Sequence, residues 1–231
     1  MAVATLLLLI SILGVGIARH QSRAALDRAY AMMDDADRLK VDENTLAEAL
    51  LFVKRFQGET RSSKPTGTCQ PSDCLAETNV LSGFYSRHTW LIPLVKRVGV
   101  HVFEFDVTLW IKNDKLIARE NIFFVPRAVG ADVYVATIMS APDERIAKHP
   151  SYQLHPGFAT SFRDFRGTPE FTYWKSASMP GQAPTLPRMS LDCVTTLDGC
   201  NMVAQILPAA WAQHQADTAK IELEKRSTSS K

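Results

Sequence analysis

The stretch that decides the fold is VHVFEFDVTLWI, residues 100–111. Apolar and polar side chains alternate along it, as in a β-strand with one packed face and one solvated face. The face expected to pack carries the odd-numbered residues His101, Phe103, Phe105, Val107, Leu109 and Ile111. A polar turn, KNDK at 112–115, leads into two further strand-like stretches at 116–125 and 132–139. The sequence therefore predicts a three-stranded antiparallel meander.

Helical signals precede and follow the meander. Thr45 and Glu48 form a capping-box pattern ahead of an apolar repeat of three and four residues, and Gly58 offers a stop, so we expect a helix over 45–57. Another helix is expected to begin at Pro208. Together with the meander, these helices predict an α+β fold in which one or two helices pack on an antiparallel sheet.

The region after the meander has weaker signals. Residues 141–187 are rich in proline, so we expect a long loop with at most one strand, near 171–174. A second hairpin is expected over 189–207, with its turn at Leu197-Asp198-Gly199. That hairpin would complete the antiparallel sheet.

The N-terminal run AVATLLLLISILGVGIA, residues 2–18, contains no charged side chain. Its length is near the lower limit for a bilayer-spanning helix, so we expect a transmembrane anchor in contact with the lipid bilayer. Gly16 and Ala18 also fit a signal-peptidase site, but no basic residue precedes the run, which favours retention over cleavage. The expected organisation is an anchor or signal segment at 1–18, a helical stalk at 19–40, a single α+β domain at 41–215 and a polar tail at 216–231.

Two signals disagree about which side of the membrane the domain occupies. Arg19, Arg23 and Arg28 follow the apolar run, and the positive-inside rule alone would keep the domain in the cytoplasm. The four cysteines form two short-range pairs instead, Cys69 with Cys74 and Cys193 with Cys200, as expected of disulfides in an oxidising compartment. A zinc site fits the second spacing poorly, and reduced thiols remain an alternative. We expect a single-pass cell-membrane protein with an extracytoplasmic domain.

No motif for catalysis, cofactor binding or nucleic-acid binding is present. The sequence lacks GxSxG, SxxK, HExxH, a Walker A loop and GxGxxG, and a net charge of +2 gives no electrostatic footprint for nucleic acid. Glu104 and Asp106 lie on one strand face as a carboxylate pair, but a solvated face explains them equally well. No cofactor or metal is therefore expected.

Five features follow one another in the first half of the chain: the apolar segment, the capped helix, the loop CQPSDC at 69–74, Asn79 with Leu81, and the alternating strand from Val100. In this order of features the chain resembles uncharacterised single-anchor bacterial proteins with exported domains. The resemblance covers roughly residues 1–125. It implies membrane attachment and an exported α+β domain, and it implies no activity.

Function follows by elimination. We expect a membrane-tethered, non-enzymatic binding or envelope-interaction module, whose partner is an envelope protein or a glycan. The alternative is a membrane-anchored hydrolase built from His149, His155 and Asp143, which cluster in the long loop.

Overall fold

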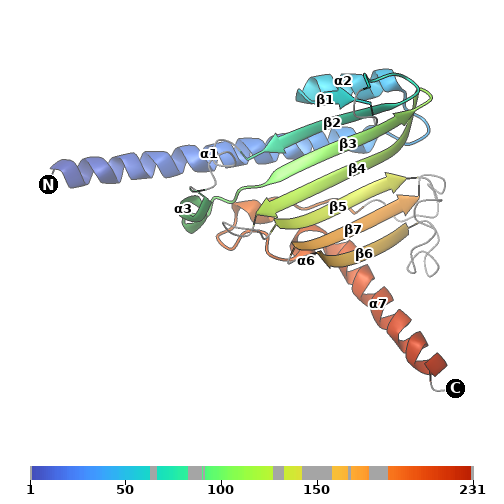
Figure 1. Ribbon diagram of the computed structural model, residues 1–231. Helices are drawn as coiled ribbons and strands as arrows, with labels where there is room; N and C mark the ends of the chain where they lie inside the picture. Colours follow the sequence, from blue (N-terminus) through green and yellow to red (C-terminus); the bar gives the residue numbers. More distant parts are fainter. Residues whose placement is uncertain are drawn as a thin grey trace.

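A seven-stranded sheet forms the centre of the molecule (Figure 1). The structure is a computed structural model that describes residues 2–62, 67–82, 90, 92–126, 133–141, 158–165, 168–176 and 187–229. The strands are β1 (Glu59–Arg61), β2 (Cys74–Leu81), β3 (Glu104–Lys112), β4 (Lys115–Pro126), β5 (Val133–Ala141), β6 (Phe158–Phe165) and β7 (Thr168–Ser176). They lie in the order β1-β2-β3-β4-β5-β7-β6.

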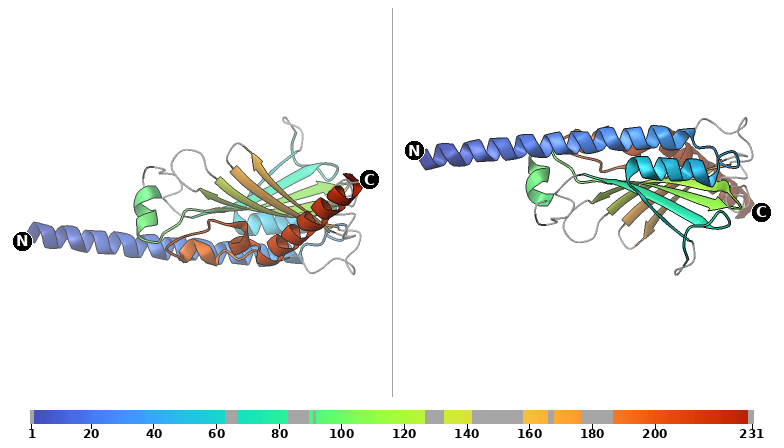
Figure 2. Two further views of the ribbon diagram at one scale, coloured as in Figure 1. Left: turned by 90° about the horizontal axis from the view of Figure 1, so that it is seen from below. Right: turned by 90° about the horizontal axis from the view of Figure 1, so that it is seen from above.

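Helices cover one face of this sheet. The described helices are α1 (Ala2–Arg38), α2 (Leu46–Phe56), α3 (Ile92–Arg97), the 3₁₀ helix η3 (Asp192–Thr195), α6 (Val203–Ile206) and α7 (Pro208–Ser229). The second half of α1 lies beside α2 against the sheet, and the first half of α1 projects beyond the domain (Figures 1 and 2). The chain therefore consists of an α+β body with a helix extending from it.

The predicted meander is confirmed as β3, β4 and β5. Adjacent strands pair antiparallel, for example Val107 with Asn121 and Asn121 with Ile138. Asn113 and Asp114 both have positive φ, 53° and 61°, which suits the tight two-residue turn between β3 and β4. The odd-numbered side chains of β3 are buried in the core that α1 and α2 cover. Alternation in the sequence thus decided which face of β3 packs.

The predicted helix over 45–57 is confirmed as α2. The Thr45 amide donates a hydrogen bond to Glu48 Oε2 at 2.8 Å, which completes the N-terminal end of the capping box. At the other end the left-handed residue is Gln57, with φ 58°, and the glycine is the next residue. A Cβ on Gly58 would lie 2.2 Å from the Glu77 carbonyl oxygen, so this position needs glycine because α2 ends directly against β2.

Three expectations about the second half of the sheet were wrong. The sheet is mixed rather than antiparallel, because β5 and β7 pair in parallel. The long loop contains two paired strands, β6 and β7, and Pro169 is tolerated because it lies one residue after the start of β7. The second hairpin is replaced by η3 and α6, where buried Leu191, Val194, Val203 and Ile206 recur at three-residue spacing rather than alternating.

The expected membrane-spanning helix was also wrong. Residues 2–18 are helical, but they are the beginning of α1, which continues without a break to Arg38. Among the residues that the structure describes, no helix has the length and apolar character needed to cross a membrane. The uncharged run would rise about 25 Å as a helix, which is shorter than the hydrocarbon core of about 30 Å.

Buried polar contacts fix α1 on the body. Arg119 on β4 is 3% exposed, and its guanidinium donates to the carbonyls of Ala36 and Leu39 and to Asp37 Oδ1, the last at 2.9 Å. Burial lowers the pKa of Arg119, and the Asp37 carboxylate opposes this shift. Arg28 donates to the Phe56 carbonyl oxygen at 2.8 Å, which joins α1 to α2. The direction of the projecting half is therefore set by contacts along its packed half.

Candidate functional site

All four cysteines form disulfides, as the short-range pairing predicted. Cys69 bridges Cys74 at the start of β2, and Cys193 in η3 bridges Cys200 in the loop that leads to α6. Bridged sulfurs cannot act as thiolate ligands, so the zinc and reduced-thiol alternatives are wrong. The two bridges indicate that the protein matures in an oxidising compartment.

The candidate hydrolase residues His149, His155 and Asp143 lie outside the described residues, and that hypothesis stays a prediction. Within the described ranges, no group of three or more His, Cys, Asp or Glu residues could hold a metal ion. His101 is a core residue, 6% exposed, with Nε2 3.1 Å from the Leu197 carbonyl oxygen. Burial lowers its pKa, and its ring nitrogen contacts the backbone of the segment between Cys193 and Cys200.

A polar groove of about 440 Å³ lies on the sheet beside the end of α2. It is lined by Gln57, Gly58, Glu59, Glu77, Thr78, Asn79, Asp106, Thr108 and Ile122. Within the described residues, Asp106 Oδ1 is buried without a hydrogen-bond partner. Burial, and then the charges of Glu104 and Glu77, raise the pKa of Asp106 to about 7. Asp106 and Glu104 share a strand face as expected, but of the two only Asp106 lines the groove.

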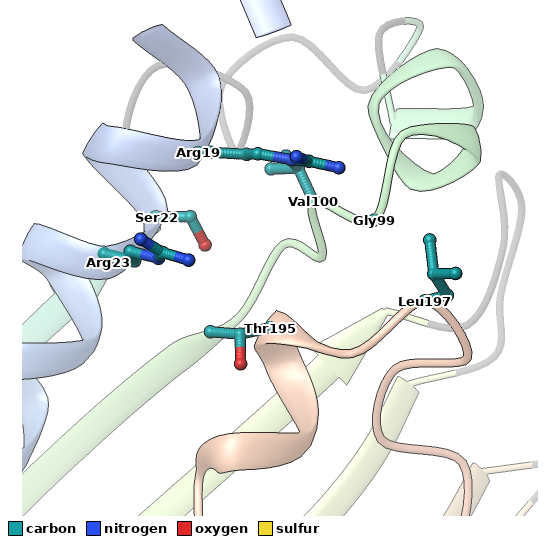
Figure 3. A pocket seen from close by; sticks show the side chains of 7 residues that line it. All are labelled: Arg19, Ser22, Arg23, Gly99, Val100, Thr195 and Leu197. Carbon is teal, nitrogen blue, oxygen red and sulfur yellow. The ribbon is translucent and has the colours of Figure 1, made fainter. Parts of the chain in front are cut away.

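A smaller pocket of about 200 Å³ lies where α1 leaves the body (Figure 3). Its lining comes from three segments: α1, the residues ahead of β3, and the Cys193–Cys200 loop. The lining residues are Arg19, Ser22, Arg23, Gly99, Val100, Thr195 and Leu197. Arg19 donates from Nη2 and Nε to the Val98 carbonyl oxygen at 3.0 and 3.3 Å. Sequence reasoning missed this pocket, because the three segments that line it are far apart in the chain.

The projecting part of α1 exposes an unusual amount of apolar surface. Leu6, Leu9, Ile10, Leu13 and Ile17 are 58%, 60%, 57%, 65% and 48% exposed. Single exposed leucines are ordinary, but several large apolar side chains exposed on one helix segment make it a candidate interaction site. Sequence reasoning treated this segment as a membrane span and so missed the spacing of its side chains along the helix.

Comparisons with known proteins give no match, whether to a family model, a curated protein or a solved structure. The resemblance to single-anchor bacterial proteins therefore stays a prediction. The candidate sites of the described residues are the projecting helix, the polar groove and the pocket.

Proposed function

We propose that this protein is a non-enzymatic binding module of an oxidising compartment, which associates through the projecting segment of α1 with the same segment of a second copy. The observation that carries the proposal is the exposed apolar surface of that segment, held clear of the body (Figure 2). An envelope protein or a glycan as a further partner of the module stays an expectation.

The spacing of the exposed residues supports helix-to-helix packing. Leu6, Ile10, Leu13 and Ile17 are separated by four, three and four residues, which is the spacing of a coiled-coil seam. The three-residue step from Ile10 to Leu13 places isoleucine at the a positions and leucine at the d positions, the choice that favours two-stranded coiled coils. The seam ends at Ile17, next to Ala18, where α1 becomes buried against the body. The apolar spacing thus belongs to the part of α1 that has room for a partner.

The apolar, uncharged surface of the segment also favours a second copy of the chain as its partner. An apolar helix surface is stable only when another apolar surface covers it, and each copy brings an identical one. No charged side chain occurs from residue 2 to residue 18, so packing of two segments would desolvate no charge. A Cβ on Gly14 or Gly16 would meet no atom within 4 Å, which leaves open space for a neighbouring helix. The segment is therefore complementary to itself in polarity, and the body of the same chain leaves its two glycines accessible.

The expected affinity can be bounded. Complete burial of one leucine or isoleucine contributes about 1.5–3 kcal/mol, so four side chains that start 48–65% exposed contribute roughly 5 kcal/mol per chain. Two chains give roughly 10 kcal/mol, against an association cost of about 4 kcal/mol or more. The surplus of at most about 6 kcal/mol corresponds to a dissociation constant of roughly 40 μM or weaker. Association is therefore expected to depend on concentration in an accessible range.

Sedimentation velocity across a concentration series, without detergent or reductant, tests the proposal. The wild type should shift from monomer to oligomer, and Leu13→Gln should weaken association by about tenfold or more, because it places an amide in the seam. Ile12→Gln is the matched control, since Ile12 is 61% exposed but lies off the seam. A monomeric wild type, or equal loss in the two variants, would contradict the proposal. Flotation of monomers with lipid vesicles would identify lipid as the occupant instead.

A further inference from the structure

We infer that the 200 Å³ pocket at the base of the projecting helix binds a single tetrahedral oxyanion, a phosphate or sulfate group. The inference does not depend on self-association, because the pocket belongs to one chain and lies beyond the end of the apolar seam. It rests on two cationic side chains, a buried hydroxyl without a partner, and the size of the pocket (Figure 3).

The cationic side chains are Arg19 and Arg23. They are four residues apart on α1, so they stand on the same face of the helix one turn apart. Arg19 uses Nε and Nη2 to hold the Val98 carbonyl oxygen, which leaves further guanidinium N–H groups free to donate. No hydrogen bond or ion pair joins Arg23 to any of the described residues. An oxyanion in the pocket would receive charge-assisted hydrogen bonds from these guanidinium groups.

The hydroxyl is that of Ser22, which lies between the arginines in sequence. Ser22 is 5% exposed, and its Oγ has no hydrogen-bond partner among the described residues. A serine within a helix commonly donates to the carbonyl four residues earlier, and Ser22 does not. Figure 3 shows its hydroxyl directed away from the α1 backbone and into the pocket. A buried donor in this position is satisfied when an acceptor oxygen occupies the pocket.

The rest of the lining sets the size and charge of the ligand. Val100, Thr195 and Leu197 line the pocket, and its described lining contains no carboxylate that would repel an anion. Thr195 already donates its hydroxyl to the Asp192 carbonyl oxygen at 2.9 Å, so the remaining donors come from α1. Drug-sized ligands need about 300–1,000 Å³, and a smaller pocket suits one oxyanion group with few attached carbon atoms.

Isothermal titration calorimetry with inorganic phosphate tests the inference on the full chain at low ionic strength. The wild type should bind phosphate saturably at one site, and Arg23→Gln should weaken binding by about tenfold or more. Arg226→Gln is the control, because Arg226 is an exposed arginine on α7 and its loss changes the net charge equally. The inference would be overturned if the wild type showed no saturable phosphate binding. It would also be overturned if Arg226→Gln weakened phosphate binding as much as Arg23→Gln does.

A second variant separates a ligand contact from a folding defect. Ser22→Ala should weaken phosphate binding by several fold, while its thermal midpoint without phosphate should be unchanged or higher. Full affinity in Ser22→Ala would overturn the inferred role of the hydroxyl. Titration with sulfate and with phenyl phosphate distinguishes the sources: equal affinities indicate a free anion, and tighter phenyl phosphate binding indicates a phosphate ester. Leu13→Gln should bind phosphate like the wild type, so failure of self-association leaves this result unaffected.

Discussion

Replacing Asp106 with asparagine should stabilise the protein at neutral and alkaline pH. Asp106 lies on β3 beside the polar groove, with one carboxylate oxygen buried and without a partner in the described part of the chain. Burial, Glu104 and Glu77 raise its pKa from 3.8 to about 7, so the folded protein holds the proton more tightly than the unfolded chain does. The stability that this proton supplies is fully present below about pH 4 and is lost as the pH rises to about 7.

The magnitude follows from the same pKa values. The rise from 3.8 to about 7 corresponds to about 4 kcal/mol for a carboxyl shielded from water. Asp106 lines an open groove, where solvent and salt screen its charge, so we expect roughly 1–2 kcal/mol. Asparagine has nearly the same shape as aspartate and does not titrate. The stability of Asp106→Asn should therefore lack this component of the pH dependence.

Urea unfolding at pH 4.5 and pH 8, without reductant, measures the effect. The free energy of unfolding of Asp106→Asn, relative to the wild type, should be roughly 1–2 kcal/mol higher at pH 8 than at pH 4.5. Glu104→Gln is the control on the same strand face, two residues away, and should give a smaller change. Parallel pH profiles for the wild type and Asp106→Asn would refute the claim that Asp106 is protonated in the folded state near neutral pH.

Two further predictions concern the framework that holds the site. Arg119→Met should lower the free energy of unfolding by about 2–4 kcal/mol, because the carbonyls of Ala36 and Leu39 and the Asp37 carboxylate lose a buried donor. The control Arg61→Met removes a surface pair with Glu77 and should cost less than about 1 kcal/mol. Similar urea midpoints for the two variants would contradict the reasoning. Replacing both Cys193 and Cys200 with serine should cost about 2.5 kcal/mol, since the bridge spans a sequence separation of 7. Reductant should then lower the thermal midpoint of this variant less than that of the wild type, and an equal response would count against the prediction.

The sequence predicted the parts of the fold whose signals are local. The alternation along residues 100–111 and the capping box at Thr45 each depend on neighbouring residues, and both were confirmed. The spacing of the cysteines likewise predicted both disulfides. Parallel pairing of β5 with β7 could not be predicted, because the two strands are separated by a long connection. The sequence of neither strand contains a periodic signal that identifies its partner.

The candidate sites were harder to predict for the same reason. The oxyanion pocket brings Arg19 beside Thr195 and Leu197, and only the folded chain places these residues together. The projecting helix is a different case, because its seam is visible in the sequence. A long apolar run has several physical explanations, and the membrane interpretation relied on total hydrophobicity where the spacing of Leu6, Ile10, Leu13 and Ile17 carried more information.

The two outer strands of the sheet have a consequence for how copies of the protein can meet. At one margin β1 offers only Glu59–Arg61, a short exposed strand with a charged residue at each end, and such margins resist intermolecular strand pairing. At the other margin, Phe162 of β6 contacts Trp211 of α7, with ring centroids 5.4 Å apart. Both features hinder growth of cross-strand aggregates. A filament or cluster of this protein would therefore have to be organised by elements outside the sheet.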